Sequence, residues 1–170
     1  SDLVREVCFP SNRITVLNNA VDTTELRLQR ASIRNEEIVA LRELYGINDG
    51  PVGVFVGSLY ADKRLDFLIE AAVAIRALLP EFELLIVGDG PESSKVQGWL
   101  NLYPWIHWVG TQLGRQKALY MSVAQVMLNP GLVGLGILDS FVCRVPMLTT
   151  DCGIHSPEIA YLVDGKNGVM

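Results

Sequence analysis

The sequence predicts an α/β fold, a Rossmann-like parallel sheet with helices on both faces. From residue 51 onward, short apolar runs alternate with segments in which apolar residues recur every three or four positions. The connections are only a few residues long, which favours parallel strands joined by helical crossovers. At 170 residues, 49% of them hydrophobic, the chain can bury one core but is short for two. We therefore expect a single domain over residues 1–170, with a lead-in over 1–50 and a Rossmann-like core over 51–170.

Five apolar runs are expected to form the strands of the core. The first, V-G-V-F-V-G at 52–57, is apolar throughout and ends in glycine. A run without alternation of polar and apolar residues indicates a strand that is buried on both faces. The same signature predicts further strands at 82–88, 106–109, 125–128 and 145–149.

Helices are expected between these strands. In the segment 65–79, Leu65, Leu68 and Ala72 recur at helical spacing, and Pro80 closes the pattern. Weaker patterns predict helices at 92–102, 115–123 and 135–142, and in the lead-in an edge strand at 14–17 and a helix at 36–45.

The composition argues against nucleic-acid partners and membrane spans. The net charge is -5, from 19 acidic and 14 basic residues, and no basic block provides a footprint for nucleic acid. No apolar stretch reaches the roughly 18 residues that span a bilayer, and no signal segment opens the chain. Three cysteines without a C-x-x-C pair fit a reducing compartment. We expect a soluble, cytoplasmic protein or, at full length, one peripheral to the cytoplasmic face of the membrane, with no transmembrane segment.

Both ends of the sequence indicate a piece of a longer protein. The first residue is Ser1 rather than Met, and Met170 follows the strand-like pair Gly168-Val169 without a stop signal. We expect a fragment that is incomplete at its carboxyl end.

Two adjacent cations stand where the first core helix begins. Open parallel sheets bind ligands at the carboxyl ends of their strands, where helix amino termini turn N–H groups outward. Lys63 and Arg64 follow the first strand at such a place. Cations there oppose the helix dipole unless an anion, naturally phosphate, binds beside them. Two solvated side chains on a first turn are an equally good interpretation of these residues alone.

The loop after the second strand is rich in glycine but is not a dinucleotide fingerprint. Its third glycine position holds Ser93, and Pro91 removes a backbone donor. A tight turn with Pro91 at the helix start is the favoured interpretation. Asp89 stays a candidate for contact with a ligand.

The loop after the fourth strand has the composition of a diphosphate cradle. Gly131, Gly134 and Gly136 allow backbone to approach a ligand closely just before a helix. Asp139, about one turn into that helix, suits the dipole and can accept hydrogen bonds from ribose hydroxyls. As a lone residue, Asp139 is more simply interpreted as a first-turn acid.

The chain has two histidines and no metal-binding signature. His107 lies within an expected strand and is interpreted as structural. His155 precedes a helix start at Ser156-Pro157, and both a ligand contact and a structural role stay open for it. We find no D-x-D, H-E-x-x-H or cysteine cluster, so no metal site is expected.

Five short motifs follow one another along nearly the whole chain. They are Asn19-Ala-Val-Asp22, Val56-Gly-Ser-Leu-Tyr-Ala-Asp-Lys63, Leu85-Ile-Val-Gly-Asp-Gly-Pro91, Trp108-Val-Gly110 and Asp164-Gly-Lys-Asn-Gly168. Their order resembles that in the carboxyl-terminal, donor-binding domain of family-4 (glycosyl transferases group 1) retaining glycosyltransferases. The corresponding family motifs are, in order, N-G-V-D, V-G-R-L-x-x-E-K, a strand with its turn, F-x-G and D-G-x-N-G. No single motif decides the match, but their order makes it strong. The resemblance implies one half of the two-domain GT-B architecture.

The resemblance assigns roles to particular residues. It makes Lys63 the ligand of the donor diphosphate and Asp139 the ligand of the ribose, and these two are the candidate catalytic residues. It sets the base against the backbone of Val109 and Gly110. The remaining expected donor contacts are Gly57, Ser58, Arg64, Asp89 and Gly131, with the amides of Leu132, Val133, Gly134 and Leu135 facing the phosphates.

The chain departs from the family pattern at two functional positions. The family has two active-site glutamates eight positions apart, and counting back from Pro146 places the second at Asp139 and the first at Gly131. The family's arginine after the first strand is Ser58 here, and Arg64 stands where glycine is usual. The first acid and that arginine are therefore absent, and Arg64 is a candidate replacement for the arginine.

The resemblance implies transfer of a glycosyl group, of the hexosyl type, from a nucleoside diphosphate sugar to an acceptor with retention of configuration. Lys63 and helix N–H groups would stabilise the leaving diphosphate without a metal, and no cofactor besides the donor substrate is implied. The implied partner is an amino-terminal Rossmann-like domain that supplies the acceptor site. We expect the isolated chain to be inactive.

Two other functions stay open at this point. A nucleotide-sugar epimerase of the same architecture would bind the donor but need no acceptor. A non-catalytic nucleotide-binding module is kept open by Gly131 and Ser58. A dinucleotide oxidoreductase is disfavoured because both glycine patterns fail, and a receiver domain because its clustered acids are absent.

Overall fold

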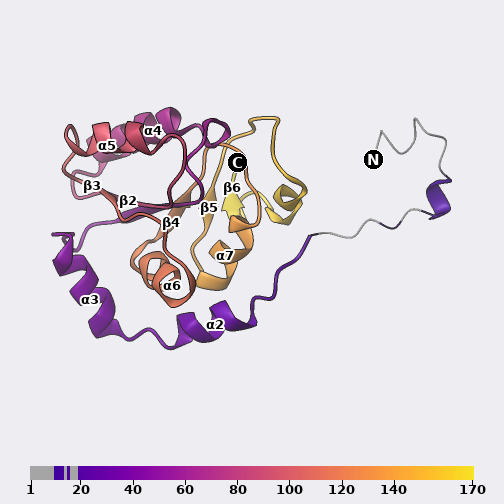
Figure 1. Cartoon of the computed structure of the whole chain (residues 1–170), viewed down its shortest axis with the longest axis horizontal. Helices are drawn as coiled ribbons and strands as arrows, with labels where there is room; N and C mark the ends of the chain where they lie inside the picture. The colour runs from indigo at the N-terminus through magenta and orange to yellow at the C-terminus, as the bar shows by residue number, and fades with distance from the viewer. Residues whose placement is uncertain (1–9, 14, 16–18) are drawn as a thin grey trace.

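A six-stranded, wholly parallel sheet forms the centre of the protein (Figure 1). The computed structural model describes residues 10–13, 15 and 19–170. The strand order is β3-β2-β1-β4-β5-β6, so the predicted fold class is confirmed. The strands are β1 Val52–Val56, β2 Glu83–Val87, β3 Ile106–Trp108, β4 Val126–Leu128, β5 Met147–Leu148 and β6 Gly168–Val169.

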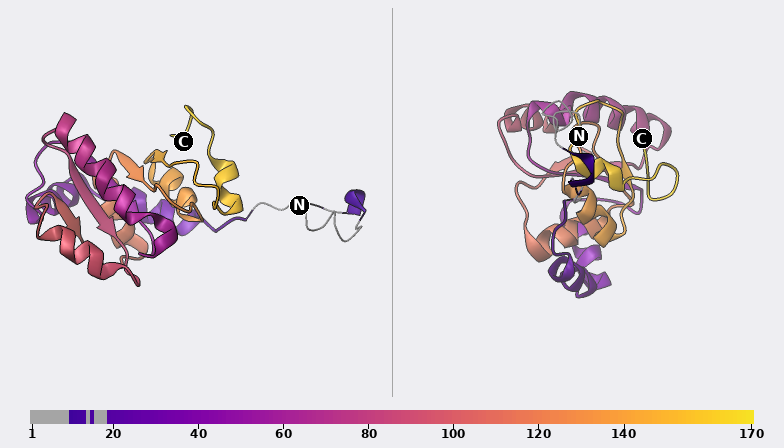
Figure 2. Two further views of the ribbon diagram at one scale, coloured as in Figure 1. Left: turned by 90° about the horizontal axis from the view of Figure 1, so that it is seen from above. Right: turned by 90° about the vertical axis from the view of Figure 1, so that its right-hand side faces the viewer.

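Helices cover the sheet on both faces (Figure 2). Two of them, α4 and α5, lie on one face, and the other four α-helices lie on the opposite face, where α2 and α3 pack against α6. The α-helices are α2 Thr24–Ala31, α3 Asn35–Leu44, α4 Leu65–Leu78, α5 Ser93–Leu100, α6 Gly114–Val123 and α7 Gly136–Cys143, and short 3-10 helices span η1 Ser11–Arg13, η2 Ala61–Lys63 and η3 Pro157–Tyr161.

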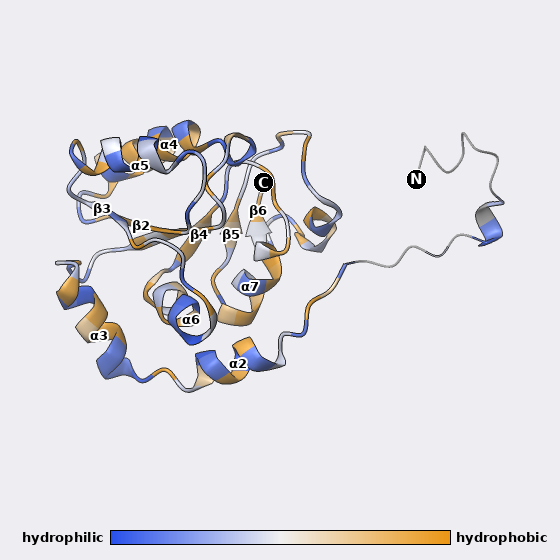
Figure 3. Cartoon of the chain, viewed as in Figure 1, coloured by the Kyte–Doolittle hydropathy of each residue, from blue (hydrophilic) through white to orange (hydrophobic). Residues whose placement is uncertain are grey.

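The alternating side chains of β2 supply both halves of the core. Leu84 and Ile86 join the cluster beneath α4 and α5, whereas Leu85 and Val87 join the cluster beneath the helices of the other face. All four are essentially inaccessible to solvent. Apolar residues on both faces explain why the run shows no alternation, and Figure 3 shows hydrophobic colour concentrated along the strands and the inward helix faces.

The lead-in contains one helix that the sequence predicted and one that it did not. The predicted helix at 36–45 corresponds to α3, whereas no helix was predicted at the position of α2. Leu26 is the buried residue of α2, so its apolar pattern is weak. The edge strand expected at 14–17 lies, apart from Thr15, outside the described residues.

The strand order creates a place for a ligand between β1 and β4. These neighbours are paired from Gly53–Val126 to Val54–Met127, and the chain leaves them for opposite faces, through α4 after β1 and through α7 after β4. The connections therefore diverge at the carboxyl ends of β1 and β4, and parallel sheets bind ligands in such a crevice.

Candidate functional site

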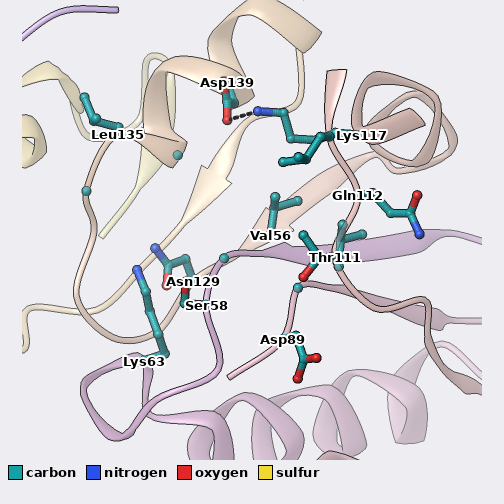
Figure 4. A pocket seen from close by; sticks show the side chains of 16 residues that line it. Val56, Ser58, Lys63, Asp89, Thr111, Gln112, Lys117, Asn129, Leu135 and Asp139 are labelled. Carbon is teal, nitrogen blue, oxygen red and sulfur yellow. Dashed lines mark hydrogen bonds and ion pairs between the residues drawn. The ribbon is translucent and has the colours of Figure 1, made fainter. Parts of the chain in front are cut away.

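A cavity of about 280 Å³ opens at the carboxyl ends of β1, β2 and β4 (Figure 4). Its walls come from the loops after β1, β2, β3 and β4, the four loops that the sequence singled out, and from the first turns of α6 and α7. It is lined by Val56, Gly57, Ser58, Lys63, Val87, Gly88, Asp89, Thr111, Gln112, Leu113, Lys117, Asn129, Gly134, Leu135, Gly136 and Asp139.

Lys63 reaches across the cavity from the β1 loop to the β4 loop. It is the last residue of η2 and is buried, with 8% of its surface exposed. Its Nζ donates a hydrogen bond to the carbonyl of Leu132. Burial lowers the pKa of Lys63, and the negative charge of Asp62 partly opposes this shift. An ammonium has three donors, so Lys63 can bind an anion in the cavity beside or in place of that carbonyl.

Arg64 points away from the cavity although it follows Lys63 directly. Its backbone adopts the left-handed conformation, with φ of 53°, between η2 and α4. Its guanidinium lies 4.8 Å from the ring centroid of Phe67, and its Nη1 donates to the Thr150 hydroxyl at 2.8 Å. That hydroxyl donates to the Pro130 carbonyl at 2.7 Å. Arg64 thus connects the loops after β4 and β5 and does not line the cavity, although the sequence made it a candidate donor contact.

Asp139 forms an ion pair that the sequence did not predict. Its Oδ2 lies 2.7 Å from Nζ of Lys117 in the first turn of α6, and both side chains are about four-fifths buried. Figure 4 shows this pair on one side of the cavity, with Lys63 and Asn129 on the other. The signal for Lys117 was present, because a cation in the first turn of a helix opposes the dipole just as Lys63 and Arg64 do.

Gly131 is in contact with the backbone of the β1 loop. A Cβ atom at this position would lie 2.1 Å from the Asp62 carbonyl oxygen and 2.5 Å from the Cα of Lys63. The adjacent Leu132 N–H donates to the same Asp62 carbonyl at 2.8 Å. The position where the resemblance expects the family's first acid therefore has no room for any side chain in this packing.

The amides of the β4 loop divide into two pairs. The N–H groups of Leu132 and Val133 bind within the protein, to the Asp62 carbonyl and to Nδ1 of His155. Gly134 and Leu135 line the cavity at the start of α7, and their N–H groups have no acceptor within the described part of the chain. Two amides, rather than the four expected from the sequence, are thus available to a ligand in the cavity.

Val109 and Gly110 do not line the cavity, and their backbone groups bind within the sheet edge. The Val109 N–H donates to the Ile86 carbonyl, and the Gly110 carbonyl accepts from the Gly88 N–H. The three residues that follow, 111–113, line the cavity instead. Of the sequence-predicted residues, Gly57, Ser58, Lys63, Asp89, Gly134, Leu135 and Asp139 line the cavity, whereas Arg64, Val109, Gly110, Gly131, Leu132 and Val133 do not.

Asn129 is a buried polar residue that the sequence interpretation missed. It follows β4, lines the cavity and exposes only 3% of its surface. Its Nδ2 lies 3.4 Å from the Leu132 carbonyl, while its Oδ1 has no hydrogen-bond partner among the described residues. A buried amide oxygen without a partner is costly, which marks this wall of the cavity as incomplete without a further donor.

The other features that the sequence raised lie away from this cavity. His107 binds Glu83 through Nε2 at 2.8 Å, in agreement with a structural role. Among the described residues, no three His, Cys, Asp or Glu side chains group as metal ligands would. None of the helices in the described ranges is long and apolar enough to cross a membrane.

The fold and the cavity define a doubly wound α/β domain whose cavity, lined by a buried lysine and the start of a helix, lies at the topological switch point. The chain belongs to the glycosyl transferases group 1 family, whose sequence profile matches residues 50–170. The predicted correspondence to the carboxyl-terminal domain of a GT-B glycosyltransferase is thereby confirmed.

Curated relatives and a solved structure agree with this assignment. The chain is 32% identical over 143 residues to a GDP-mannose-dependent alpha-(1-6)-phosphatidylinositol monomannoside mannosyltransferase of Mycolicibacterium smegmatis, covering 76% of this chain and 37% of the relative. It is 26% identical over 148 residues to alpha-monoglucosyldiacylglycerol synthase of Acholeplasma laidlawii, covering 83% and 36%. The crystal structure of Anabaena HepE in complex with UDP superposes with a TM-score of 0.73 at 18% identity, over 97% of this chain and 45% of that one. The chain thus spans about a third of the length of these curated relatives.

Proposed function

We propose that this chain binds the nucleoside diphosphate part of a sugar donor in the cavity between β1 and β4. The observation that carries the proposal is that a buried lysine, Lys63, shares a cavity with the N–H groups of Gly134 and Leu135 at the start of α7, which have no acceptor among the described residues. A lysine and a helix amino terminus directed at one small volume form a site for phosphate. The solved structure with UDP supports UDP as the first ligand to test.

We further propose that the complete protein transfers the sugar to an acceptor with retention of configuration. As the glycosidic bond to phosphate breaks, negative charge develops on the leaving diphosphate. Lys63 and the two amides would stabilise that charge electrostatically, without a divalent metal. The acceptor would come from a second, amino-terminal domain, so this chain alone would show no transfer. A cytoplasmic location and a hexosyl donor belong to the same proposal.

The ribose and the base would lie on the side of the cavity nearer β3. Asp139 would accept hydrogen bonds from the ribose hydroxyls, and Lys117 holds its carboxylate at the cavity wall. The backbone and side chains of residues 111–113 would face the base, in place of Val109 and Gly110.

One observation favours a second candidate, a non-catalytic donor-binding module. Gly131 cannot hold the family's first acid without moving the β1 loop. An acid beside the sugar would have to come from elsewhere. Donor binding without transfer or hydrolysis by the full-length protein would support this candidate over the transferase.

Calorimetric titration of the chain with UDP, in the presence of a chelator, tests the proposal. We expect a dissociation constant between about 1 μM and 1 mM, as for half of a cleft. The same titration with magnesium should give an unchanged constant. Binding that requires magnesium, or no heat with UDP, GDP or ADP, would count against the site.

A further inference from the structure

His155 lies behind the cavity, in the loop between β5 and η3, and its ring contacts two backbone groups. Its Nδ1 lies 3.1 Å from the amide nitrogen of Val133, and its Nε2 lies 2.7 Å from the carbonyl oxygen of Thr150. The Cys152 sulfur is 3.5 Å from Nε2. His155 does not line the cavity, so any effect on the donor acts through these contacts.

These contacts fix the protonation of the ring. A backbone N–H can only donate and a carbonyl can only accept. Nδ1 must therefore carry a lone pair toward Val133, and Nε2 must carry the proton toward Thr150. His155 is a neutral imidazole in the Nε2–H tautomer.

Val133 is held by this histidine at the point where the β4 loop turns into the cavity. Its carbonyl accepts from the Ser156 N–H at 3.0 Å, and its side chain is completely buried. On the other edge of the same peptide, the Leu132 carbonyl accepts from Lys63. The peptide between residues 132 and 133 is thus fixed from both sides. Gly134 follows directly and is the first residue of this loop whose N–H has no acceptor in the described part of the chain.

We propose that His155 is a positioning residue for donor binding. As a neutral Nε2–H imidazole it orients Val133, so that the N–H groups of Gly134 and Leu135 face the donor diphosphate. It touches no part of the donor. This inference rests on the proposed function of the cavity and adds the residue that sets the geometry of its backbone.

Protonation of the ring would remove this support. An Nδ1–H group would face the Val133 N–H, and two donors cannot bind each other. The titratable or charged groups around the ring are the Cys152 thiol, Arg64 through Thr150, and Lys63 across the loop. A ring that carries protons on both nitrogens should therefore weaken donor binding.

Two substitutions separate the two contacts of the ring. His155→Asn keeps an acceptor, Oδ1, at the position of Nδ1, whereas His155→Gln keeps a donor at the position of Nε2 and leaves Val133 without its acceptor. With UDP-glucose as the probe, we expect His155→Asn to stay within about threefold of the parent affinity and His155→Gln to lose about tenfold. His107→Asn, at the chain's other histidine, is the matched control and should bind like the parent.

The pH profile adds a readout that a merely structural role would not move. When the pH is lowered until the imidazole rings are protonated, the parent and His107→Asn should lose affinity for UDP-glucose, while His155→Asn should not. The diphosphate of UDP-glucose keeps its negative charge throughout, so the ligand itself contributes no change. Equal affinities of the Asn and Gln variants, or equal pH profiles of parent and His155→Asn, would overturn the inference.

Nitrogen-15 NMR of the ligand-free chain keeps this test separate from the test of the proposed function. We expect an unprotonated Nδ1 on His155 and a shift of the Gly134 amide signal when the ring is protonated. An Nδ1-protonated ring, or a Gly134 signal that ignores ring protonation, refutes the positioning role. If the NMR is as expected but UDP-glucose does not bind at all, the proposed function fails and the loop contact stands.

Discussion

Buried polar side chains are hydrogen-bonded to different extents at the two ends of the sheet. At the amino end of β2, the carboxylate of Glu83 is 93% buried as a residue and is fully used, by Nη1 of Arg76 at 3.0 Å and by Nε2 of His107 at 2.8 Å. At the carboxyl end of β4, the equally buried Asn129 keeps one oxygen without a partner in the described part of the chain. A closed network contributes to stability, whereas an open one leaves hydrogen-bonding capacity for a ligand.

The largest effect is expected from Gly131→Glu, which should disrupt the contact between the β1 and β4 loops at the carboxyl end of the sheet. This substitution restores the family's first acid in name, but its Cβ would collide with backbone atoms at 2.1 to 2.5 Å. We expect about 1 to 3 kcal/mol less stability in urea unfolding and loss of UDP binding, because the β1 and β4 loops must separate. Gly134→Ala is the matched control: its Cβ would meet only atoms at 3.9 Å. A variant that folds like the parent and binds donor more tightly would show that the site tolerates the acid after all.

The second prediction is that substitutions at the two ends of the sheet have separate effects, on UDP binding at the carboxyl end and on stability at the amino end. Lys63→Met removes a charge-assisted contact to phosphate and should weaken UDP binding by roughly ten- to a hundredfold, with little change for uridine. Glu83→Gln at the amino end should instead lower stability by about 1 to 3 kcal/mol, because it leaves Arg76 with a weaker partner in a largely buried place. Its affinity for UDP should equal that of the parent. If Glu83→Gln weakens binding as much as Lys63→Met, the two ends are not independent.

The pKa of Lys63 gives this prediction a pH dependence. Burial lowers that pKa, so the ammonium loses its proton at a lower pH than an ordinary lysine. Phosphate binds the charged form, and parent affinity for UDP should therefore fall as the pH rises toward the alkaline range. Lys63→Met lacks this alkaline decline, and a decline of equal size in the variant would assign it to another group.

The sequence predicted the sheet well because its strands are buried on both faces. The five strands predicted for the core are all present, each within a residue or two of its expected bounds, and the continuous apolar runs that indicated them follow from the two-sided core. Helix α2 escaped prediction because it buries a single residue, Leu26, against the domain. Its sequence, T-E-L-R-L-Q-R-A, is mostly polar, so few apolar positions mark it as a helix that packs on a core.

The site was less predictable because directions of side chains depend on backbone turns. Lys63 and Arg64 are equivalent in the sequence, yet the left-handed backbone of Arg64 sends only Lys63 toward the cavity. The contact between Gly131 and the Asp62 carbonyl is a long-range packing fact that no local pattern encodes. Lys117, in contrast, could have been found by applying the dipole argument to every helix start.

The smallest predicted effect concerns the ion pair between Lys117 and Asp139. Asp139→Asn keeps the shape of the carboxylate but turns one acceptor into a donor, so it should weaken uridine and UDP binding alike, by about three- to tenfold. Lys117→Met leaves the carboxylate charge uncompensated on the cavity wall. It should therefore weaken UDP more than uridine, by a few-fold, because only UDP carries negative charge.

The double variant Lys117→Met, Asp139→Asn tests whether Lys117 acts only by compensating the charge of Asp139. With both charges gone, the extra penalty for UDP should disappear and the loss should match that of Asp139→Asn alone. Both side chains are about four-fifths buried, so the cost of removing the charges from water offsets much of their attraction and the double variant should unfold close to the parent. Lys117→Met leaves one charge without its partner and should unfold at a lower urea concentration. A double variant that still disfavours UDP over uridine would mean that Lys117 contacts the diphosphate directly. The two lysines would then form one phosphate site, with Asp139 serving to position the second.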